Sequence, residues 1–464
     1  ELWSFMPPEF YSKINRRYVN TAQIATLTVT GTPKDYGMDG SVTAYVTGSG
    51  DAWVYAGMRR GGRTMYAFNV NHTTPSAITA KWKVGCDSSG CFTASGTTGN
   101  NGNFDGMGQS WAIPKVFRAF GYGSGASPML VMGGGYDAAC EDASSFSCAS
   151  TTGNHIYVMD ADSGKLLKVF DTTRGVTGDV LMLQDGSGMA TYGYAADLGG
   201  NVYRISGATA GDPIGATAPA NWTITRIAAL GCDTPGTCTS PPNRKFIFGP
   251  DVVVEGGFNI LLIGSGDREK PVNYTNTVQN YFFMLKDRPS DSSWLTSEAV
   301  SGRCGTGNAV LCLASLAPPI SVGTCTTPTN QQKGWALQLT STEQVVTSAI
   351  TVVGTAYFST HQPVEVSANS CTSSLGRSRA YAISYTNASS ATGCKADGTT
   401  DNTFVLLQAG GLPPSPVAGK VKLDDGTIVP FVIGAKGPLQ STAVKAPGSN
   451  PRGTKIRSYW YIRK

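Results

Sequence analysis

Cysteines are the residues whose type and spacing say most about the chemistry of this chain, because two nearby thiols can be oxidised to a disulfide. The chain has 11 cysteines, and ten of them fall into five pairs that are near in sequence. Their Gly-, Ser- and Thr-rich surroundings favour small disulfide-closed surface loops, and none has the CxxC spacing of a zinc site. The pairs are Cys86/Cys91, Cys140/Cys148, Cys232/Cys238, Cys304/Cys312 and Cys371/Cys394.

The disulfides predict a compartment for the chain. Disulfides persist in oxidising surroundings such as the periplasm or the cell exterior. The alternative is a cytosolic protein with reduced, scattered cysteines. Because 11 is odd, one thiol is left over or pairs with another chain, and Cys325 is the candidate. Cys325 also competes for Cys304, Cys312, Cys371 and Cys394, so the exact pairing of these five stays open.

Three arginines form a second group with chemical potential. Arg59, Arg60 and Arg63 flank the Gly61-Gly62 pair. Guanidinium groups beside a glycine turn can hold an anion together with backbone amides, which makes these three arginines a candidate anion-binding site. The alternative, which the sequence favours, is a β-hairpin whose arginines pair with acidic groups of a neighbouring sheet.

The remaining titratable groups favour structural roles. Asp267 and Glu269 are two residues apart and share one side of a strand, but an ion-pair turn explains them better than a catalytic pair. The three histidines, His72, His155 and His361, lie in separate parts of the chain. The sequence has no GxSxG nucleophile motif, so hydrolase chemistry is unsupported.

The elements that must position these residues are short strands. An apolar strand runs into a Gly-rich turn, and an aromatic-containing strand follows after an insertion of variable length. Such a repeat predicts the blades of a β-propeller, whereas a β-sandwich would not need a repeated unit. The expected strand pairs are 53–57 with 65–69, 129–133 with 156–160, 192–194 with 201–205, 260–264 with 281–285 and 355–358 with 379–383.

Composition agrees with an all-β protein. The 57 glycines in 464 residues exceed the usual share of about 7%, and charged residues at 14% fall short of the usual quarter or so. Only Pro7–Ile14 looks helical. We expect residues 86–106, 207–245 and 288–333 to be long loop insertions.

Charge and hydropathy exclude two classes of partner. The net charge of +5 is spread along the chain, whereas nucleic-acid binders concentrate basic residues in a patch. No apolar run approaches the length of about 18 residues that a membrane span needs. We therefore expect neither nucleic-acid binding nor a membrane span.

Seven segments, in order, resemble one known family. The chain is similar to the C-terminal propeller of type IV pilus tip-associated adhesins of the PilC/PilY type. The match extends over essentially the whole chain, and its motifs are specific as an ordered set. The segments are ELWSFMPPE at 1–9, GMRRGGRTMYA at 57–67, GGGYD at 133–137, IYVMDADSGK at 156–165, DLGGNVYR at 197–204, IGSGDRE at 263–269 and YWYI at 459–462.

The resemblance implies fold, location and function. It implies a modified, quinoprotein-like β-propeller of about seven blades with disulfide-stapled loop insertions, forming a single domain over 1–464. Its first blade would be incomplete at the N-terminus, and the family's N-terminal region would be absent. The implied role is non-enzymatic: pilus biogenesis, adhesion and twitching motility at an extracellular pilus tip, reached through the periplasm. Its partners would be minor pilins of the tip complex and a host or abiotic surface receptor.

The family also implies a calcium loop, which is degenerate in this sequence. Family members place Asp-x-Asp-x-Asp-Gly-x-x-Asp just before the Asp-x-Gly-Gly-Asn-Val segment. Counting back from Asp197 aligns it with Leu183, Asp185, Ser187, Gly188 and Thr191, so only Asp185 keeps a carboxylate. Calcium prefers several hard oxygen ligands. We therefore expect a plain β-turn without calcium, and no cofactor.

Two other functions stay open at this stage. One is a secreted carbohydrate- or receptor-binding propeller unconnected with pili. The other is a quinoprotein dehydrogenase using pyrroloquinoline quinone, because residues 157–167 also resemble the blades of that class. Such enzymes typically hold the quinone against a disulfide between adjacent cysteines, and this sequence has no Cys-Cys pair. A shared fold does not fix a shared function.

Overall fold

The computed structural model describes most of the chain. The described residues are 2–19, 35–94, 104–142, 151–235, 243–273, 277–324, 328, 332–364, 374–391, 403–408, 410–422, 428–434 and 441–443. They fall into two compact units. Unit 1 comprises Glu1–Val180 with Ala216–Asn221, and unit 2 comprises Leu181–Gly215 with Trp222–Lys464.

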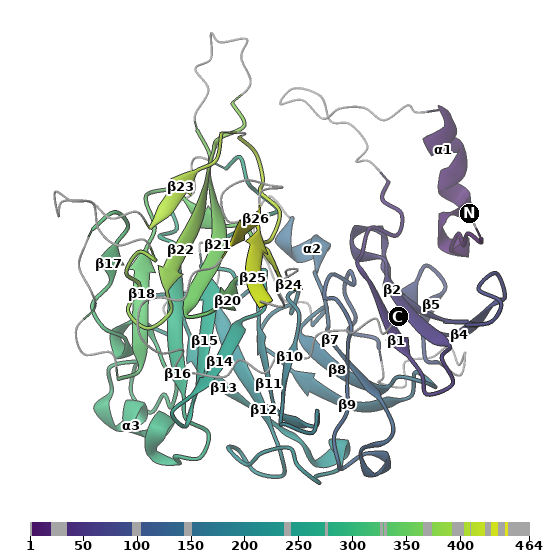
Figure 1. The fold of residues 1–464 in the computed structure, drawn as a ribbon, viewed down its shortest axis with the longest axis horizontal. Helices are drawn as coiled ribbons and strands as arrows, with labels where there is room; N and C mark the ends of the chain where they lie inside the picture. Colours follow the sequence, from purple (N-terminus) through teal and green to yellow (C-terminus); the bar gives the residue numbers. More distant parts are fainter. Residues whose placement is uncertain are drawn as a thin grey trace. The chain divides into compact units, whose positions relative to one another are not determined.

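Unit 1 contains two antiparallel sheets (Figure 1). Helical turns η1 (Pro8–Lys13) and α1 (Ile14–Val19) precede the first sheet, η2 (Arg59–Gly61) lies inside it, and α2 (Ala138–Glu141) lies inside the second. The first sheet is β1 (Val42–Val46), β2 (Ala52–Gly57), β3 (Arg63–Val70), β4 (Ile78–Asp87) and β5 (Gly90–Phe92). The second is β6 (Lys115–Phe117), β7 (Met129–Gly133), β8 (His155–Asp160) and β9 (Leu166–Asp171).

Unit 2 contains four sheets among its described residues. The first is β10 (Leu181–Gln184), β11 (Ala190–Ala196), β12 (Asn201–Ser206) and β13 (Thr223–Ala229). The second is β14 (Asp251–Glu255), β15 (Phe258–Gly264), β16 (Tyr281–Asp287), β18 (Gly334–Gln338) and β17 (Ile320–Ser321), with α3 (Ser293–Ser301) in the β16–β18 connection. The third is β19 (Gln344–Val345), β20 (Ile350–Val352), β21 (Thr355–Gln362), β22 (Arg377–Ser384) and β23 (Phe404–Leu406). The fourth is β24 (Val417–Lys422), β25 (Ile428–Ile433) and β26 (Ser441–Ala443).

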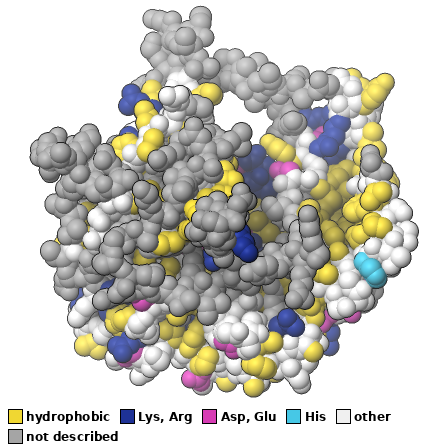
Figure 2. Space-filling view, viewed as in Figure 1, with side chains coloured by type: hydrophobic (Ala, Val, Ile, Leu, Met, Phe, Trp, Pro, Cys, Tyr) yellow, Lys and Arg dark blue, Asp and Glu magenta, His cyan; other side chains and the backbone are white. Residues whose placement is uncertain are grey.

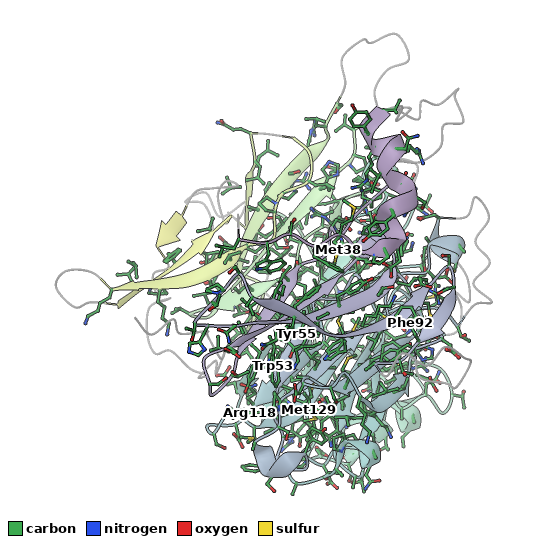
Figure 3. All side chains as sticks on the ribbon, turned by 90° about the vertical axis from the view of Figure 1, so that its right-hand side faces the viewer. Met38, Trp53, Tyr55, Phe92, Arg118 and Met129 are labelled. Carbon is green, nitrogen blue, oxygen red and sulfur yellow. A yellow bond between two sulfur atoms is a disulfide. The ribbon has the colours of Figure 1, made fainter. Side chains whose placement is uncertain are left out.

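The central strands are rich in apolar residues, and within each unit neighbouring sheets pack against one another. All five residues of β7 are buried. In unit 1 one core joins the two sheets, with Tyr55 and Met65 from the first meeting Leu130 and Tyr157 from the second. Trp53, two residues before Tyr55 on β2, packs against the same core (Figure 3). Burial of such side chains is worth about 1.5–3 kcal/mol each.

Unit 2 repeats this arrangement from sheet to sheet. One core joins β11 and β12 to β15 and β16, and a second joins β15 and β16 to β21 and β22. In the second core Phe282 stacks on Phe358 with ring centroids 3.8 Å apart, and Phe358 stacks on Tyr381 at 4.7 Å. Consecutive meanders packed face to face are the architecture of a β-propeller.

The predicted all-β propeller fold is therefore confirmed, with six sheets among the described residues where about seven blades were expected. All three expected loop insertions are wrong in part. Residues 86–106 contain the end of β4 and all of β5. Residues 207–245 contain strand β13, whose exposed Arg226 and half-buried threonines hid its apolar face. Residues 288–333 contain helix α3 rather than loop alone.

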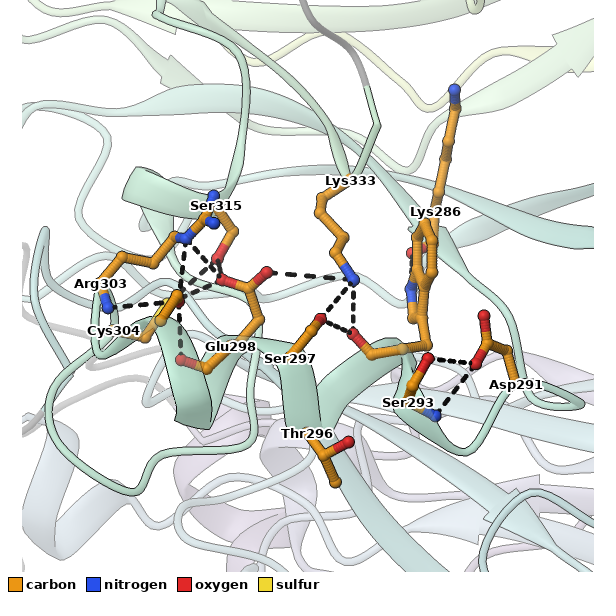
Figure 4. A network of polar contacts seen from close by, with 12 residues as sticks. Lys286, Asp291, Ser293, Thr296, Ser297, Glu298, Arg303, Cys304, Ser315 and Lys333 are labelled. Atoms are coloured by element: carbon orange, nitrogen blue, oxygen red, sulfur yellow. Dashed lines mark hydrogen bonds and ion pairs between the residues drawn. The ribbon is translucent and has the colours of Figure 1, made fainter.

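Helix α3 is fixed by a buried carboxylate beside a disulfide (Figure 4). Glu298 is 1% exposed, and its Oε2 atom accepts a hydrogen bond of 2.6 Å from Ser315 Oγ. Arg303 and Lys333 form ion pairs with it at 3.4 Å and 3.9 Å. Ser315 Oγ also lies 3.0 Å from Cys304 Sγ, so the insertion has its own polar core.

Candidate functional site

The arginine turn that forms the candidate anion-binding site is held in an unusual backbone conformation. Arg59 has φ +48°, in the left-handed region that residues other than glycine seldom adopt. Ser110 Oγ accepts hydrogen bonds from the backbone N–H of Met58 at 2.8 Å and of Arg59 at 3.3 Å. Such strain persists where surrounding contacts fix it, and it is frequent at functional sites.

Two of the three arginines share one aromatic platform. The guanidinium carbon of Arg59 lies 4.7 Å from the centroid of the Trp111 ring, and that of Arg60 lies 5.5 Å from it. Trp111 in turn stacks on Tyr136 at 4.6 Å and donates its Nε1–H to Gln109. The ring system therefore fixes where both guanidinium groups lie.

One carboxylate faces these two arginines. Asp39 accepts a hydrogen bond from the Arg60 backbone N–H at 3.0 Å, and its Oδ2 lies 3.9 Å from Arg59 Nη1. Arg60 Nη1 also donates to the Tyr36 hydroxyl at 3.0 Å. Asp39 belongs to the segment just before β1 of the same sheet, not to a neighbouring sheet as the alternative interpretation required.

Arg63 does not share the contacts of Arg59 and Arg60 with Trp111 and Asp39. It donates to the backbone carbonyl oxygens of Met107 and, at 3.0 Å, of Asp105. It therefore braces the segment before β6. Anion binding by the arginine turn stays a prediction, now centred on Arg59 and Arg60.

Two of the expected disulfides lie within the described residues. They join Cys86 to Cys91 and Cys304 to Cys312. Cys140 and Cys232 are also disulfide-bonded. Their expected partners, Cys148 and Cys238, and the other predicted cysteines, Cys325, Cys371 and Cys394, lie outside the described residues.

The degenerate calcium loop forms the turn between β10 and β11. Asp185 Oδ1 accepts hydrogen bonds from Ser187 Oγ at 2.7 Å, Ser187 N–H at 2.8 Å and Met189 N–H at 3.0 Å. The Ser187 hydroxyl, followed by the Met189 amide, holds the pKa of Asp185 below its usual value. Thr191 Oγ1 donates to the Leu183 carbonyl at 3.3 Å. The Asp185 carboxylate thus closes the turn through its own hydrogen bonds. The hydroxyl protons of Ser187 and Thr191 are donated to acceptors within the turn.

The other titratable residues are dispersed in the structure. His72 pairs with Asp51 at 2.8 Å and His155 with Asp171 at 3.0 Å, while His361 Nε2 lies 2.8 Å from the Leu375 carbonyl oxygen. Asp267 pairs with Lys245 at 2.9 Å, as an ion-pair turn requires, but not with adjacent Arg268. Within the part of the chain that the structure describes, no three His, Cys, Asp or Glu residues lie together as metal ligands would.

Sequence reasoning missed the groups that complete the arginine site. Trp111, Tyr36 and Asp39 carry no motif, and they reach the turn only through the fold. Lys and Arg side chains on the face shown in Figure 2 lie in several separate groups among the described residues. None of the described helices is long and apolar enough to serve as a membrane span.

A family model and one solved structure both relate this chain to PilY1. Residues 18–235 match the family model for the PilY1 beta-propeller domain. The crystal structure of the Pseudomonas aeruginosa PilY1 C-terminal domain is similar with a TM-score of 0.60 and 15% identity, covering 97% of this chain and 89% of that chain. A search of the curated proteins finds no match.

A second structure is similar to a lesser degree. It is a quinohemoprotein alcohol dehydrogenase from Pseudomonas putida, with a TM-score of 0.41 and 12% identity, covering 87% of this chain and 56% of that chain. A likeness this weak carries no argument about function. Residues 18–235 of this chain therefore match the PilY1 β-propeller domain family, and the chain shares the fold of the P. aeruginosa PilY1 domain over 97% of its length.

Proposed function

We propose that this chain is a non-enzymatic protein of the type IV pilus tip that acts in pilus biogenesis, surface adhesion and twitching motility. The single observation that carries the proposal is the PilY1 propeller match over residues 18–235, since that family is pilus-associated. The proposed location is extracellular, at the filament end, after export through the periplasm. The proposed partners are minor pilins of the tip complex and a surface receptor.

The stapled loops support a role outside the cell. Short disulfide-closed loops such as Cys86–Cys91 and Cys304–Cys312 suit an oxidising compartment. The histidines described above are dispersed, and the carboxylates already form hydrogen bonds or ion pairs within the chain. Both observations favour a binding function over catalysis, because a catalytic site needs an acid, base or nucleophile directed at a shared point.

Deletion and localisation test the proposal together. A strain lacking this chain should lose surface pili or twitching zones, and complementation with the chain should restore both. Gold-labelled antibody should decorate one end of isolated filaments under the electron microscope. Normal piliation and twitching in the deletion strain, with no label at filament ends, would leave a secreted binding propeller unconnected with pili as the better description.

The same purified protein distinguishes the enzyme alternative. A quinoprotein dehydrogenase would carry a quinone chromophore and reduce an artificial electron acceptor in the presence of an alcohol. We expect no quinone absorbance and no acceptor reduction after incubation with pyrroloquinoline quinone and calcium. Turnover in that assay would contradict a non-enzymatic role.

A further inference from the structure

Arg59 has hydrogen-bonding capacity that the protein does not use. A guanidinium carries five N–H donors in a planar fork. Within the described residues, the Arg59 guanidinium donates no hydrogen bond and has only the 3.9 Å ion pair with Asp39 and the stack on Trp111. About a third of the side chain, 33%, is exposed. Its donors are therefore fixed in place and open to an acceptor from outside.

A second basic pair lies next to this turn. An added Cβ on Gly61 would lie 1.8 Å from the Gly37 carbonyl oxygen, and one on Gly37 would lie 3.2 Å from Arg17 Nη1. The segment 35–39 thus lies between α1 and the arginine turn, and only glycine permits this close approach. Arg17 donates to the Asp35 carbonyl oxygen, and Arg16 pairs with the Asp35 carboxylate at 3.2 Å.

Four arginines gather in this region. Arg16, Arg17, Arg59 and Arg60 lie around the segment that carries Asp35 and Asp39. Guanidinium groups held close together attract a ligand that carries more than one anionic group. Arginine suits carboxylate and sulfate because its planar fork donates two parallel hydrogen bonds.

Exposed tyrosines lie on α1, which carries Arg16 and Arg17, and on the preceding turn η1. Tyr11 on η1 is 60% exposed and Tyr18 on α1 is 88% exposed. Tyrosine offers a flat apolar face together with a hydroxyl group, which suits a sugar ring with its hydroxyls. We propose that Arg59 and Arg60, extended by Arg16 and Arg17, bind the repeating oxyanions of an acidic polysaccharide. The choice of a polysaccharide rests on the surface-attachment role proposed above.

Binding by the purified full chain tests this inference. The probes are heparin, which carries sulfate and carboxylate, polygalacturonate, which carries carboxylate only, and neutral dextran. At a salt concentration of about 50 mM, where the screening length is long, we expect saturable calorimetric binding of heparin, polygalacturonate or both, and none of dextran. The two acidic probes distinguish sulfate from carboxylate recognition.

Matched variants locate the binding. Arg59→Gln/Arg60→Gln should lower the affinity by about tenfold or more, because charge-assisted hydrogen bonds are lost. Arg118→Gln is the control, since Arg118 is exposed and lies well away from Met38, the neighbour of Asp39, in the same unit (Figure 3). If the double variant misfolds, Arg59→Gln alone leaves the contacts of Arg60 with Tyr36 and Asp39 in place and should still weaken binding.

Several results would overturn the inference: no binding of either acidic probe, wild-type affinity in the folded variants, or an equal loss in Arg118→Gln. Equal affinity for duplex DNA or anionic vesicles, with the same loss in the variants, would assign the site to another class of ligand. None of these results depends on pili. Failure here therefore leaves the proposed function to be judged by the deletion strain alone.

Discussion

Asp287 is fully buried, and its charge is balanced by neighbours from another sheet of unit 2. Arg204 Nη1 donates to both of its carboxylate oxygens, at 2.7 Å and 2.9 Å, and the Tyr194 hydroxyl donates to Oδ2 at 2.7 Å. Asn259 completes the group by donating to the Tyr194 hydroxyl. Burial, followed by the nearby Asp287 charge, raises the pKa of Tyr194 well above its usual value, so it remains a donor.

Removal of this carboxylate should destabilise unit 2 strongly. Asp287→Ala leaves the Arg204 guanidinium buried without a counter-charge, which costs about 3–5 kcal/mol. Urea denaturation followed by tryptophan fluorescence measures the loss. Asp171→Ala is the control, because that side chain is 87% exposed and its ion pair among the described residues is with His155; it should cost less than about 1 kcal/mol. A loss of stability in Asp287→Ala as small as that in the control would show that Arg204 finds another partner or reaches water.

Asp185 offers a second residue-scale test, through its pKa. Because the Ser187 hydroxyl lowers that pKa, the ionised carboxylate stabilises the folded turn. This stabilisation is present above the unfolded value of about 3.9 and is lost as the pH falls through the folded value. In Ser187→Ala, the carboxyl pKa measured by NMR should rise toward the usual value. Ser293→Ala, which removes a similar hydroxyl donor to Asp291, should leave it unchanged. An unaltered pKa in Ser187→Ala would assign the effect to backbone amides alone.

Only part of the arginine site could be predicted at this scale. The Gly61-Gly62 pair with its three arginines is visible in the sequence, but the split between them is not. Arg63 donates its hydrogen bonds to the carbonyl oxygens of Asp105 and Met107. Arg59 instead stacks on the Trp111 ring. Trp111 and Asp39 are 72 positions apart, so spacing alone does not reveal that both reach the turn.

At the scale of elements, the central strands were predictable and the outer strands were not. The expected segments 129–133 and 156–160 correspond to β7 and β8, and 260–264 and 281–285 lie within β15 and β16. Strands β15 and β16 are apolar on both faces because sheets of unit 2 cover them on both sides. Strand β13 begins with three half-buried residues and one exposed residue before its buried end, and α3 lies in a Ser-rich stretch, so neither produced a clear pattern.

The two described disulfides should differ in their resistance to reduction. Cys304 and Cys312 are both fully buried, whereas Cys91 is partly exposed in the short β4–β5 hairpin. Attack on a disulfide requires that the thiolate reach a sulfur atom. Under native conditions, limited dithiothreitol followed by alkylation and peptide mapping should label Cys86 and Cys91 first. Labelling of both pairs should become equal in urea, which serves as the control.

Simultaneous labelling of both pairs without denaturant would contradict that order. It would show that the insertion around α3 opens readily. In that case Glu298→Gln, which weakens the ion pairs to Arg303 and Lys333, should accelerate labelling of Cys304 further.

The β10–β11 turn should not respond to calcium. Only one carboxylate, Asp185, lies in the degenerate loop, and its Oδ1 atom already accepts three hydrogen bonds. Calcium needs six to eight oxygen ligands, so this loop offers too few. Addition of calcium or of a chelator should leave the melting temperature of the purified chain unchanged. Micromolar binding in calorimetry that disappears in Asp185→Ala would restore the family's calcium site.

For the whole molecule, cysteine oxidation links the fold to the compartment. Four different cysteines are disulfide-bonded within the two described pairs, and Cys140 and Cys232 are bonded as well. If all five predicted pairs form, ten of the 11 cysteines are oxidised and one thiol remains. The prediction therefore concerns the entire chain and the place where it folds.

Protein recovered from its native cells should carry one reactive thiol per chain. Denaturation without reductant, alkylation with iodoacetamide and intact-mass measurement should show one added label, and peptide mapping should place it on Cys325. Reduction before alkylation is the control and should add 11 labels. A chain that takes up 11 labels without reductant would have folded in a reducing compartment, which would contradict an exported pilus protein. A disulfide-linked dimer with no free thiol would instead show that the odd cysteine joins two copies, and reductant should then release the monomer.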